Sequence, residues 1–425
     1  MTDLLAIASY LVLPLIGIAI WRVDLVREET LAVRITIATA AGALIVGLTM
    51  ALLSLLGIQW SRTLLYSLFA IVAAVGFYVR KPGTRRGSGM KFNAWLAGTI
   101  FMWLVTLYGT LTARESCGDL HFTWGPKAIR FFRAGGIDAT LLQTYIQLTT
   151  DYPPLQTLLF AWSNTWSKQF SWWSAVILSP LFLIGTLLLI RTWSGDDKGT
   201  FLVAATMTWT FTLAYPAGCA EPLLLLYETM VIAALTFLRD PRAQTLYATL
   251  GCAGAAWTKL EGTTFTIAVV ITILLVQRNW RRALIVAAPA ALLVGAWLTF
   301  VLNAKILLMY GGAKLPIQWH ALPVVLKTLA KVAKWELYWI PWIVPAVLIA
   351  IGNVKRAIVP ISIAVLTAGA TVSFYLRAGD PVWWIESSSP RVILTPLLAL
   401  LLGAIAAHQP HHQGQALPTD GEPVQ

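Results

Sequence analysis

Charged residues are scarce in this sequence, and their scarcity excludes an ordinary soluble protein. Of the 425 residues only 12% are Asp, Glu, Lys or Arg, whereas 58% are hydrophobic. A soluble domain carries about 25% charged residues. Apolar runs of roughly 17 to 25 residues recur along the chain, which is the length that crosses a bilayer core as a helix. The sequence therefore predicts an all-α polytopic membrane protein.

Acidic residues and cysteines are few as well. The 31 lysines and arginines outnumber the 19 acidic residues and give a net charge of +12. They gather in loops between apolar runs, where cations set topology and meet anionic headgroups, so the excess does not indicate nucleic-acid binding. Cys117, Cys219 and Cys252 lack the spacing of metal ligands. A disulfide between Cys117 and Cys219, both expected to face outward, is left open.

Recognisable nucleotide and metal motifs are absent. The sequence has no Walker A motif, no Rossmann glycine fingerprint, no Cys/His metal set and no nucleophile elbow. Its predicted cytosolic loops are too short for a nucleotide-binding domain. Any activated substrate is therefore expected to arrive in the membrane. No cofactor is assigned from the sequence, and a divalent cation stays open as an alternative.

About 13 membrane spans are predicted, with the N-terminus outside and the C-terminus inside. The first, Leu4–Ile20, is followed rather than preceded by cations, which argues against a cleaved signal peptide. Five cations mark Arg80–Lys91 as an inside loop. The remaining predicted spans are Arg34–Leu56, Leu64–Val79, Ala94–Leu111, Trp172–Ile190, Thr200–Tyr215, Pro222–Leu238, Thr245–Trp257, Gly262–Val276, Ala283–Leu302, Glu336–Ile351, Ala357–Leu376 and Val392–Ala407.

Three parts of the chain follow from this topology. Residues 1–91 hold three additional N-terminal spans, and residues 92–407 form the main transmembrane module. The polar tail 408–425 is predicted to be disordered in the cytoplasm. The first large outside loop has juxtamembrane helices of its own. Within it, Leu155–Trp166 is too short to cross the bilayer and is expected to lie at the outer surface.

The longest polar interruption, Arg114–Leu155, is where chemistry is expected. Asp119 follows the fourth span almost at once, and His121 comes two residues later. A carboxylate at the membrane boundary that faces a cavity can act as a general base toward an acceptor hydroxyl or amine. A solvated loop aspartate or a helix cap is the alternative interpretation.

A short basic helix is predicted next in this loop. Pro126 suits the first position of a helix, on which Lys127, Arg130 and Arg133 would share one side. Such a helix would lie flat, with aromatic residues in lipid and cations among the headgroups. The cations fit either ordinary headgroup attraction or a clamp on the phosphate of an anionic lipid substrate.

Further charges are predicted at the same outer boundary. Asp151 and Tyr152 precede a double proline, which fixes an extended entry to the next helix. Glu221 lies in one short outside turn, and Lys259 and Glu261 lie in the next. Each alone fits a charge at a helix end, but charges at membrane depth usually face a cavity. Arg391 opens the final span and could reach a phosphate.

This arrangement resembles the GT-C class of polyprenyl-phosphate-sugar glycosyltransferases, such as the protein O-mannosyltransferases and the lipid A aminoarabinose transferases. In those enzymes an acidic residue begins the first large outside loop, as Asp119 does here. A PPL motif closes that loop, like Asp151–Leu155, and a later acidic residue resembles Glu221. A Lys-x-Glu-Gly turn of bacterial members resembles Lys259–Gly262. The resemblance covers roughly residues 95–400.

Two departures from the family pattern are visible. Many members carry two adjacent acidic residues at the catalytic position, whereas Leu120 follows Asp119 here. The aminoarabinose enzymes have lysine directly before the double proline, where this chain has Tyr152. Lys127 or Arg391 would then replace that lysine as a phosphate ligand.

The resemblance implies an inverting glycosyltransferase of the bacterial inner membrane. A sugar on a polyprenyl phosphate would be transferred at the outer, periplasmic face to a lipid, glycan or protein acceptor. Asp119 would take the acceptor proton, and cations would stabilise the departing lipid phosphate. The implied site comprises catalytic Asp119, Asp151 and Glu221, phosphate-binding Lys127, Arg130, Lys259 and Arg391, and the further candidates His121, Tyr152 and Glu261.

A transporter or flippase of an anionic lipid-linked sugar is the alternative function. Its signature would be internal repeats and broken spans near the middle of the bilayer. The sequence has no clear repeat, and its charges cluster at one face, which favours the enzyme.

Overall fold

The structure is a computed structural model that describes residues 2–83, 92–112, 118–144, 151–214, 218–306, 316–335 and 339–409. Across these ranges every regular element is a helix and there is no strand. The predicted all-α class is confirmed. The Arg80–Lys91 loop beyond residue 83, Cys117 and the tail from residue 410 lie outside the described residues, and so does the Cys117–Cys219 disulfide that the sequence leaves open.

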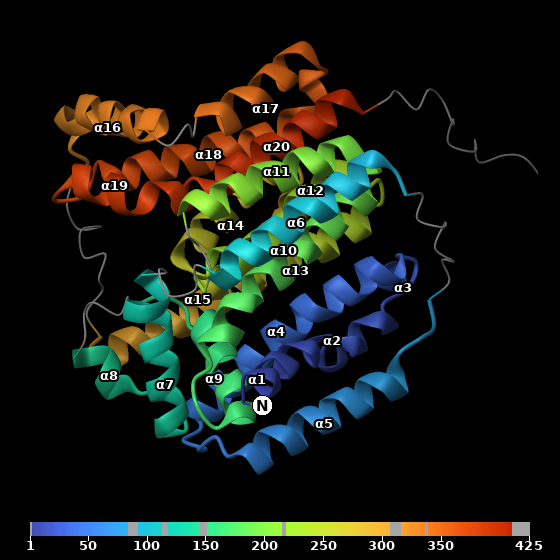
Figure 1. Cartoon of the computed structure of the whole chain (residues 1–425), viewed down its shortest axis with the longest axis vertical. Coiled ribbons are helices and arrows are strands. Elements are labelled where there is room, and N and C mark those ends of the chain that lie inside the picture. The colour runs from blue at the N-terminus through green and yellow to red at the C-terminus, as the bar shows by residue number, and fades with distance from the viewer. Residues whose placement is uncertain are drawn as a thin grey trace, which may run out of the picture.

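The N-terminal region forms a group of its own at one side of the molecule (Figure 1). The predicted first span is broken into short pieces, and Gly17 lies at the break between α2 and η1. A Cβ atom at Gly17 would come within 2.0 Å of the carbonyl oxygen of Ala38, so only glycine lets α2 approach α4 this closely. The elements are α1 (Thr2–Leu11), α2 (Leu13–Ile16), η1 (Ile18–Arg22), α3 (Asp24–Arg27), α4 (Leu31–Leu55) and α5 (Arg62–Val79).

The middle of the chain contains a single helix, the large outside loop and two further long helices. The loop elements α7 and α8 gather with α16 and α19 at one end of the molecule, away from α3 (Figure 1). The elements are α6 (Ala94–Thr112), η3 (Leu120–Trp124), α7 (Gly125–Ala134), α8 (Ala139–Thr144), α9 (Leu155–Ser167), α10 (Trp172–Ser194) and α11 (Asp197–Ala214).

The C-terminal half is helical throughout its described residues. Its elements are α12 (Glu221–Phe237), α13 (Pro241–Thr258), α14 (Leu260–Leu275), α15 (Trp280–Asn303), η6 (Trp319–Ala321), α16 (Leu322–Trp335), α17 (Trp339–Ile351), η7 (Val354–Ala357), α18 (Ile358–Tyr375), α19 (Pro381–Val392) and α20 (Leu394–His408). Helix α12 packs against α10, α13 and α20 and is buried almost along its whole length. It is the centre of the bundle.

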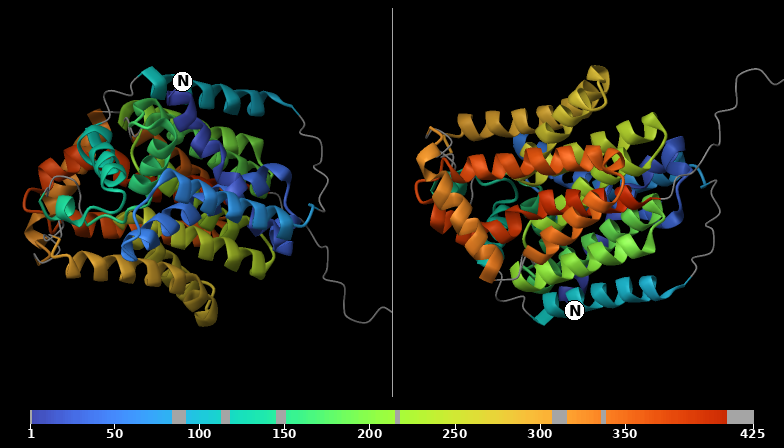
Figure 2. Two further views of the ribbon diagram at one scale, coloured as in Figure 1. Left: turned by 90° about the horizontal axis from the view of Figure 1, so that it is seen from below. Right: turned by 90° about the horizontal axis from the view of Figure 1, so that it is seen from above.

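Apolar helices on the flanks are mostly not buried inside the protein, as expected where lipid replaces water. Helices α6 and α15 lie on opposite flanks of the bundle (Figure 2), and only 22% of each span is buried. Within the described residues, seven helical segments are long and apolar enough to cross a membrane, or eight if the bent pair α19 and α20 forms one span. A polytopic membrane protein is therefore supported, and the finer count of 13 spans stays a prediction.

Two helices of the outside loop differ from expectation. The helix predicted at Leu155–Trp166 forms as α9, but it is buried against α1, α4 and α7 instead of lying on the surface. On α7 the ammonium of Lys127 and the ring of Phe131 are both buried, so the helix is not divided into lipid-facing aromatics and exposed cations. The loop folds back into the protein because its aromatic side chains find packing partners there.

Candidate functional site

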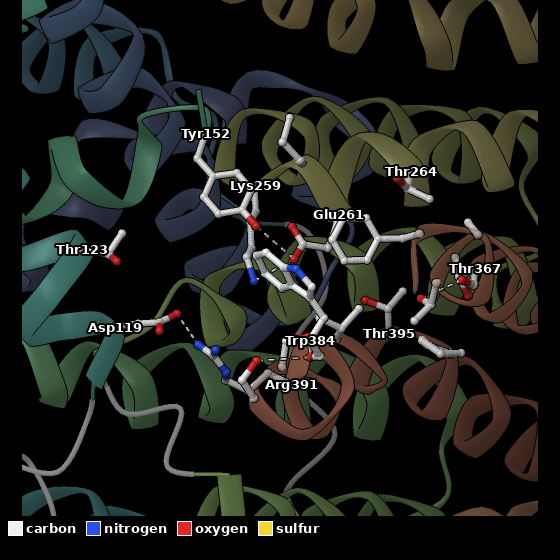
Figure 3. A pocket seen from close by; sticks show the side chains of 18 of the residues that line it. Asp119, Thr123, Tyr152, Lys259, Glu261, Thr264, Thr367, Trp384, Arg391 and Thr395 are labelled. Carbon is white, nitrogen blue, oxygen red and sulfur yellow. Dashed lines mark hydrogen bonds and ion pairs between the residues drawn. The ribbon is translucent and has the colours of Figure 1, made fainter. Parts of the chain in front are cut away.

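A cavity of about 480 Å³ opens between the outside loop and the C-terminal helices (Figure 3). Asp119, directly before η3, borders it on one side, and Lys259 and Glu261 border it from the turn between α13 and α14. Arg391 enters from α19. Segments far apart in the sequence thus converge on one space. η3 is a π-helix, a geometry that is often found at functional sites.

Lys259, at the cavity wall, pairs with two carboxylates, of which only that of Glu261 also lines the cavity. Its Nζ lies 2.9 Å from Oε1 of Glu221 and 2.9 Å from Oε1 of Glu261. Both glutamates stand in the first turns of their helices, where the helix dipole favours negative charge. Burial alone would lower the pKa of Lys259, but the carboxylates of Glu221 and Glu261 raise it, so the ammonium stays charged.

Arg391 makes the second ion pair of the cavity. Its Nη1 donates to Oδ2 of Asp119 and lies 3.9 Å from Oε1 of Glu221 (Figure 3). The Asp119 side chain is 34% exposed, whereas that of Glu221 is 4% exposed. Asp119 is therefore the carboxylate that a bound molecule can reach most easily.

Tyr152 points into the same space from the segment before α9. Its hydroxyl lies 3.5 Å from Oε1 of Glu261, and the Nζ of Lys259 lies 5.7 Å from its ring centroid. The ring stacks on Trp124 with a centroid distance of 5.8 Å. The residue that departs from the family pattern is thus part of the cavity wall (Figure 3).

Lys127 and Asp151 lie behind this wall. Both are buried, and neither is among the residues that line the cavity. Nζ of Lys127 lies 5.1 Å from the ring centroid of Trp124. Burial lowers the pKa of Lys127 to about 7, although the Asp151 carboxylate opposes that shift. The backbone oxygen of Asp151 accepts a hydrogen bond of 2.8 Å from Nε1 of Trp297. The pair supports the segment that carries Tyr152.

Two further predicted site residues, Arg130 and His121, do not reach the cavity. Arg130 is 54% exposed and lies 3.7 Å from the carboxylate of Asp138. The ring of His121 packs on Trp172 with a centroid distance of 4.5 Å, and no hydrogen bond from it to Asp119 is found in the described residues. The structure therefore brings Asp119, Glu221, Lys259, Glu261, Tyr152 and Arg391 together and leaves Arg130, His121, Lys127 and Asp151 apart.

Several polar groups were missed by the sequence analysis. Thr395 lines the cavity and donates a 2.8 Å hydrogen bond to Glu228, which is fully buried in α12. A glutamate inside the apolar run from Leu223 to Leu235 is the signal that would have identified it, because acidic residues at membrane depth are costly. Hydroxyls of Thr367, Thr371, Ser387 and Ser388 also line the cavity.

A second cavity of about 350 Å³ adjoins the first. The two share Thr371 and Pro396 in their walls. Its lining comes from α16 to α20 and is almost wholly apolar, with Trp339, Trp342 and Ile343 among the larger side chains. A polar space with charged walls thus continues into an apolar one.

Comparison of the chain with family models, with curated proteins and with solved structures finds no match. In the part of the chain that the structure describes, no group of three or more His, Cys, Asp or Glu side chains is arranged to hold a metal ion. The geometry of the two cavities is therefore the main indication of function.

Proposed function

We propose that the protein is an integral-membrane glycosyltransferase that moves a sugar from a polyprenyl-phosphate donor to an acceptor. The observation that carries the proposal is the pair of adjoining cavities, one with cations in its wall and one apolar. A molecule with a phosphate head and a long apolar tail fits the two together, with the head beside Lys259 and Arg391. A polyprenyl-phosphate sugar has this form, and it also carries a polar sugar for the charged space.

The head of the donor fits the cations of the larger cavity. Arg391 and Lys259 lie at its wall, and a guanidinium binds phosphate oxygens through two parallel hydrogen bonds. As the sugar leaves, the phosphate oxygen gains negative charge, which preorganised cations stabilise most strongly in a site shielded from water. The hydroxyls of Ser387 and Ser388 are placed to hold sugar hydroxyl groups.

Asp119 is the proposed general base. It is the most exposed carboxylate at the cavity, and it stands at the end where the outside loop meets the bundle. The acceptor oxygen or nitrogen loses its proton to Asp119 as it forms a bond to the anomeric carbon. The bond from that carbon to the phosphate oxygen breaks on the opposite face, so the configuration inverts. Glu221 and Glu261 keep Lys259 charged and in place.

The acceptor in this proposal is a lipid, glycan or protein at the outer face of a bacterial inner membrane. The N-terminus would be outside and the C-terminus cytoplasmic, as the distribution of cations in the sequence favours. The cavity end of the molecule, with α7, α8, α16 and α19, would then face the periplasm (Figure 1).

A transporter of the same anionic lipid-linked sugars is the second candidate. One observation favours it: helices α19 and α20 form a pair that is bent by 40° at a short break. Three residues near this break, Arg391, Thr395 and Pro396, line the larger cavity. Broken helices at a binding site are typical of secondary transporters.

Purified protein in liposomes separates the two candidates. A panel of polyprenyl-phosphate sugars with radiolabelled sugar is supplied with membrane extract as the source of acceptors. Appearance of label in a new product, together with free polyprenyl phosphate, supports the glycosyltransferase. Movement of intact donor between leaflets without transfer supports the transporter and contradicts the enzyme.

A further inference from the structure

Every cation that lines the larger cavity already has a carboxylate partner, as far as the structure describes the chain. Lys259 is held by Glu221 and Glu261, and Arg391 is held by Asp119. The three carboxylates outnumber the two cations. An incoming phosphate therefore meets an acidic surplus, and like charges at close range in a partly buried site repel strongly.

A phosphate binds most favourably to a cation here when it displaces one of these carboxylates, because an anion added beside an intact ion pair lies close to the carboxylate and is repelled by it. The Lys259 side chain is 7% exposed and bonded on two sides, and that of Glu221 is 4% exposed. The Arg391 and Asp119 side chains are 19% and 34% exposed. The more exposed pair loses less on separation, because the freed carboxylate regains water.

The geometry of Arg391 suits an exchange of partners. Its guanidinium presents five donors in a rigid plane, which match a phosphate as well as a carboxylate. Its Nη1 also approaches Glu221, so part of the guanidinium stays anchored when Asp119 leaves.

We propose that the donor phosphate replaces Asp119 as the ion-pair partner of Arg391. This exchange releases the Asp119 carboxylate, which then acts as the general base. The inference rests on the proposed function and adds to it an order of binding, in which the donor enters before the acceptor is activated. Arg391 then acts as a phosphate ligand and, through Asp119, as a positioning residue for the acceptor.

The exchange changes the chemistry of Asp119. While Asp119 is paired with Arg391, a guanidinium N–H donates to its Oδ2, so this oxygen is not available to an acceptor. After the exchange, Oδ2 is released and can accept the proton of the acceptor. The arrival of the donor thus prepares the base that the acceptor needs.

Donor binding in the absence of acceptor tests the exchange. The probe is farnesyl phosphate, titrated calorimetrically into the full-length protein in detergent. The Asp119→Asn variant should bind it about tenfold more tightly than the parent, a factor that corresponds to ~1.4 kcal/mol. Glu386→Gln serves as the matched control, because Glu386 pairs with Lys331 on the exterior of the same helix as Arg391. Its affinity should not change.

A second variant distinguishes exchange from a general effect of charge. Glu261→Gln also removes a negative charge at the cavity, but Glu221 still holds Lys259. It should tighten binding less than Asp119→Asn does. Equal gains in the two variants, or no gain in Asp119→Asn, overturn the exchange. A parent protein that does not bind farnesyl phosphate at all overturns the proposed function itself.

The parent protein offers a readout that needs no variant. Difference infrared spectra on addition of farnesyl phosphate should contain a shifted carboxylate stretch, because Asp119 loses its ion pair. Farnesol, which lacks the phosphate, should not produce the shift. A spectrum without a carboxylate change on farnesyl phosphate binding contradicts the exchange even if Asp119→Asn fails to fold.

Discussion

Two buried lysines at the same end of the molecule have opposite environments. Lys259, at the cavity wall, contacts two carboxylates, and these raise its pKa against the effect of burial. Lys127, behind the wall, lies over the ring of Trp124, and burial lowers its pKa to about 7. The comparison teaches that burial by itself does not decide whether an amine is charged. The number of nearby carboxylates decides it, because each one offsets part of the lost hydration.

The largest expected effect is a loss of turnover on substitution of Asp119, which lines the cavity as Lys259 does. Asp119→Asn keeps the shape of the side chain but removes its basicity, so turnover should fall by about 10²–10⁴-fold, the usual contribution of base catalysis. Asp151→Asn, behind the wall with Lys127, should lower turnover much less. Radiolabel transfer in liposomes measures both. Retention of more than about a tenth of the turnover by Asp119→Asn, or a larger loss in Asp151→Asn, would contradict the assignment.

The two lysines should differ in their effects on stability. Lys259→Met leaves Glu221 and Glu261 without their cation, and removing one partner of a buried pair costs about 3–5 kcal/mol. Lys127→Met removes an amine that faces one carboxylate, that of Asp151, and whose pKa burial already lowers to about 7, so the variant should cost less. Urea or thermal unfolding in detergent measures both free energies. Equal losses would mean that the two environments are not distinct.

A pH series sharpens the comparison further. The pKa of Lys127 is about 7 in the folded protein, whereas an unfolded lysine titrates near 10.4. Between these two pKa values the unfolded chain binds more protons than the folded protein. The free energy of unfolding therefore rises with pH through Lys127, by up to about 1.4 kcal/mol per pH unit. Below about pH 7 both states are protonated and the burial penalty is constant.

The parent should therefore gain stability relative to Lys127→Met as the pH rises from about 7 to 10. Thermal unfolding at matched detergent concentration measures the difference between the two proteins. A difference that does not change across this range would show that Lys127 is charged like an ordinary lysine.

The smallest effect is expected at Arg130, one of the cations that the sequence predicts as a phosphate ligand. Arg130 pairs with Asp138 at the exterior and does not line the cavity. Arg130→Ala should change farnesyl phosphate affinity by less than about twofold, as is usual for an exposed ion pair. Arg391→Ala should weaken it by tenfold or more, since charge-assisted hydrogen bonds contribute about 1.5–3 kcal/mol. Equal losses of farnesyl phosphate affinity in the two variants would indicate that Arg130 on α7 also binds the phosphate.

The predictability of the site varied from residue to residue. Asp119, Glu221, Lys259, Glu261 and Arg391 were predicted to lie at one outer boundary, and the structure brings them together. That depth could be predicted because hydrophobic length places each turn in the bilayer. Arg130 and Arg133 share one side of a helix with Lys127 in sequence, yet Lys127 is buried, since the rotation of a short amphipathic helix depends on its packing partners.

Composition and hydrophobic length alone determined that this is an all-α membrane protein with many of its charges near helix ends, because a long apolar helix satisfies its own backbone groups and can therefore cross a bilayer. The tertiary structure decided the rest. It buried α9, which was expected on the surface, and paired Asp119 with Arg391, 272 residues away in the sequence. It also joined an apolar cavity to the charged one. Such contacts depend on how helices rotate and cross, and the spacing of residues within one helix does not contain that information.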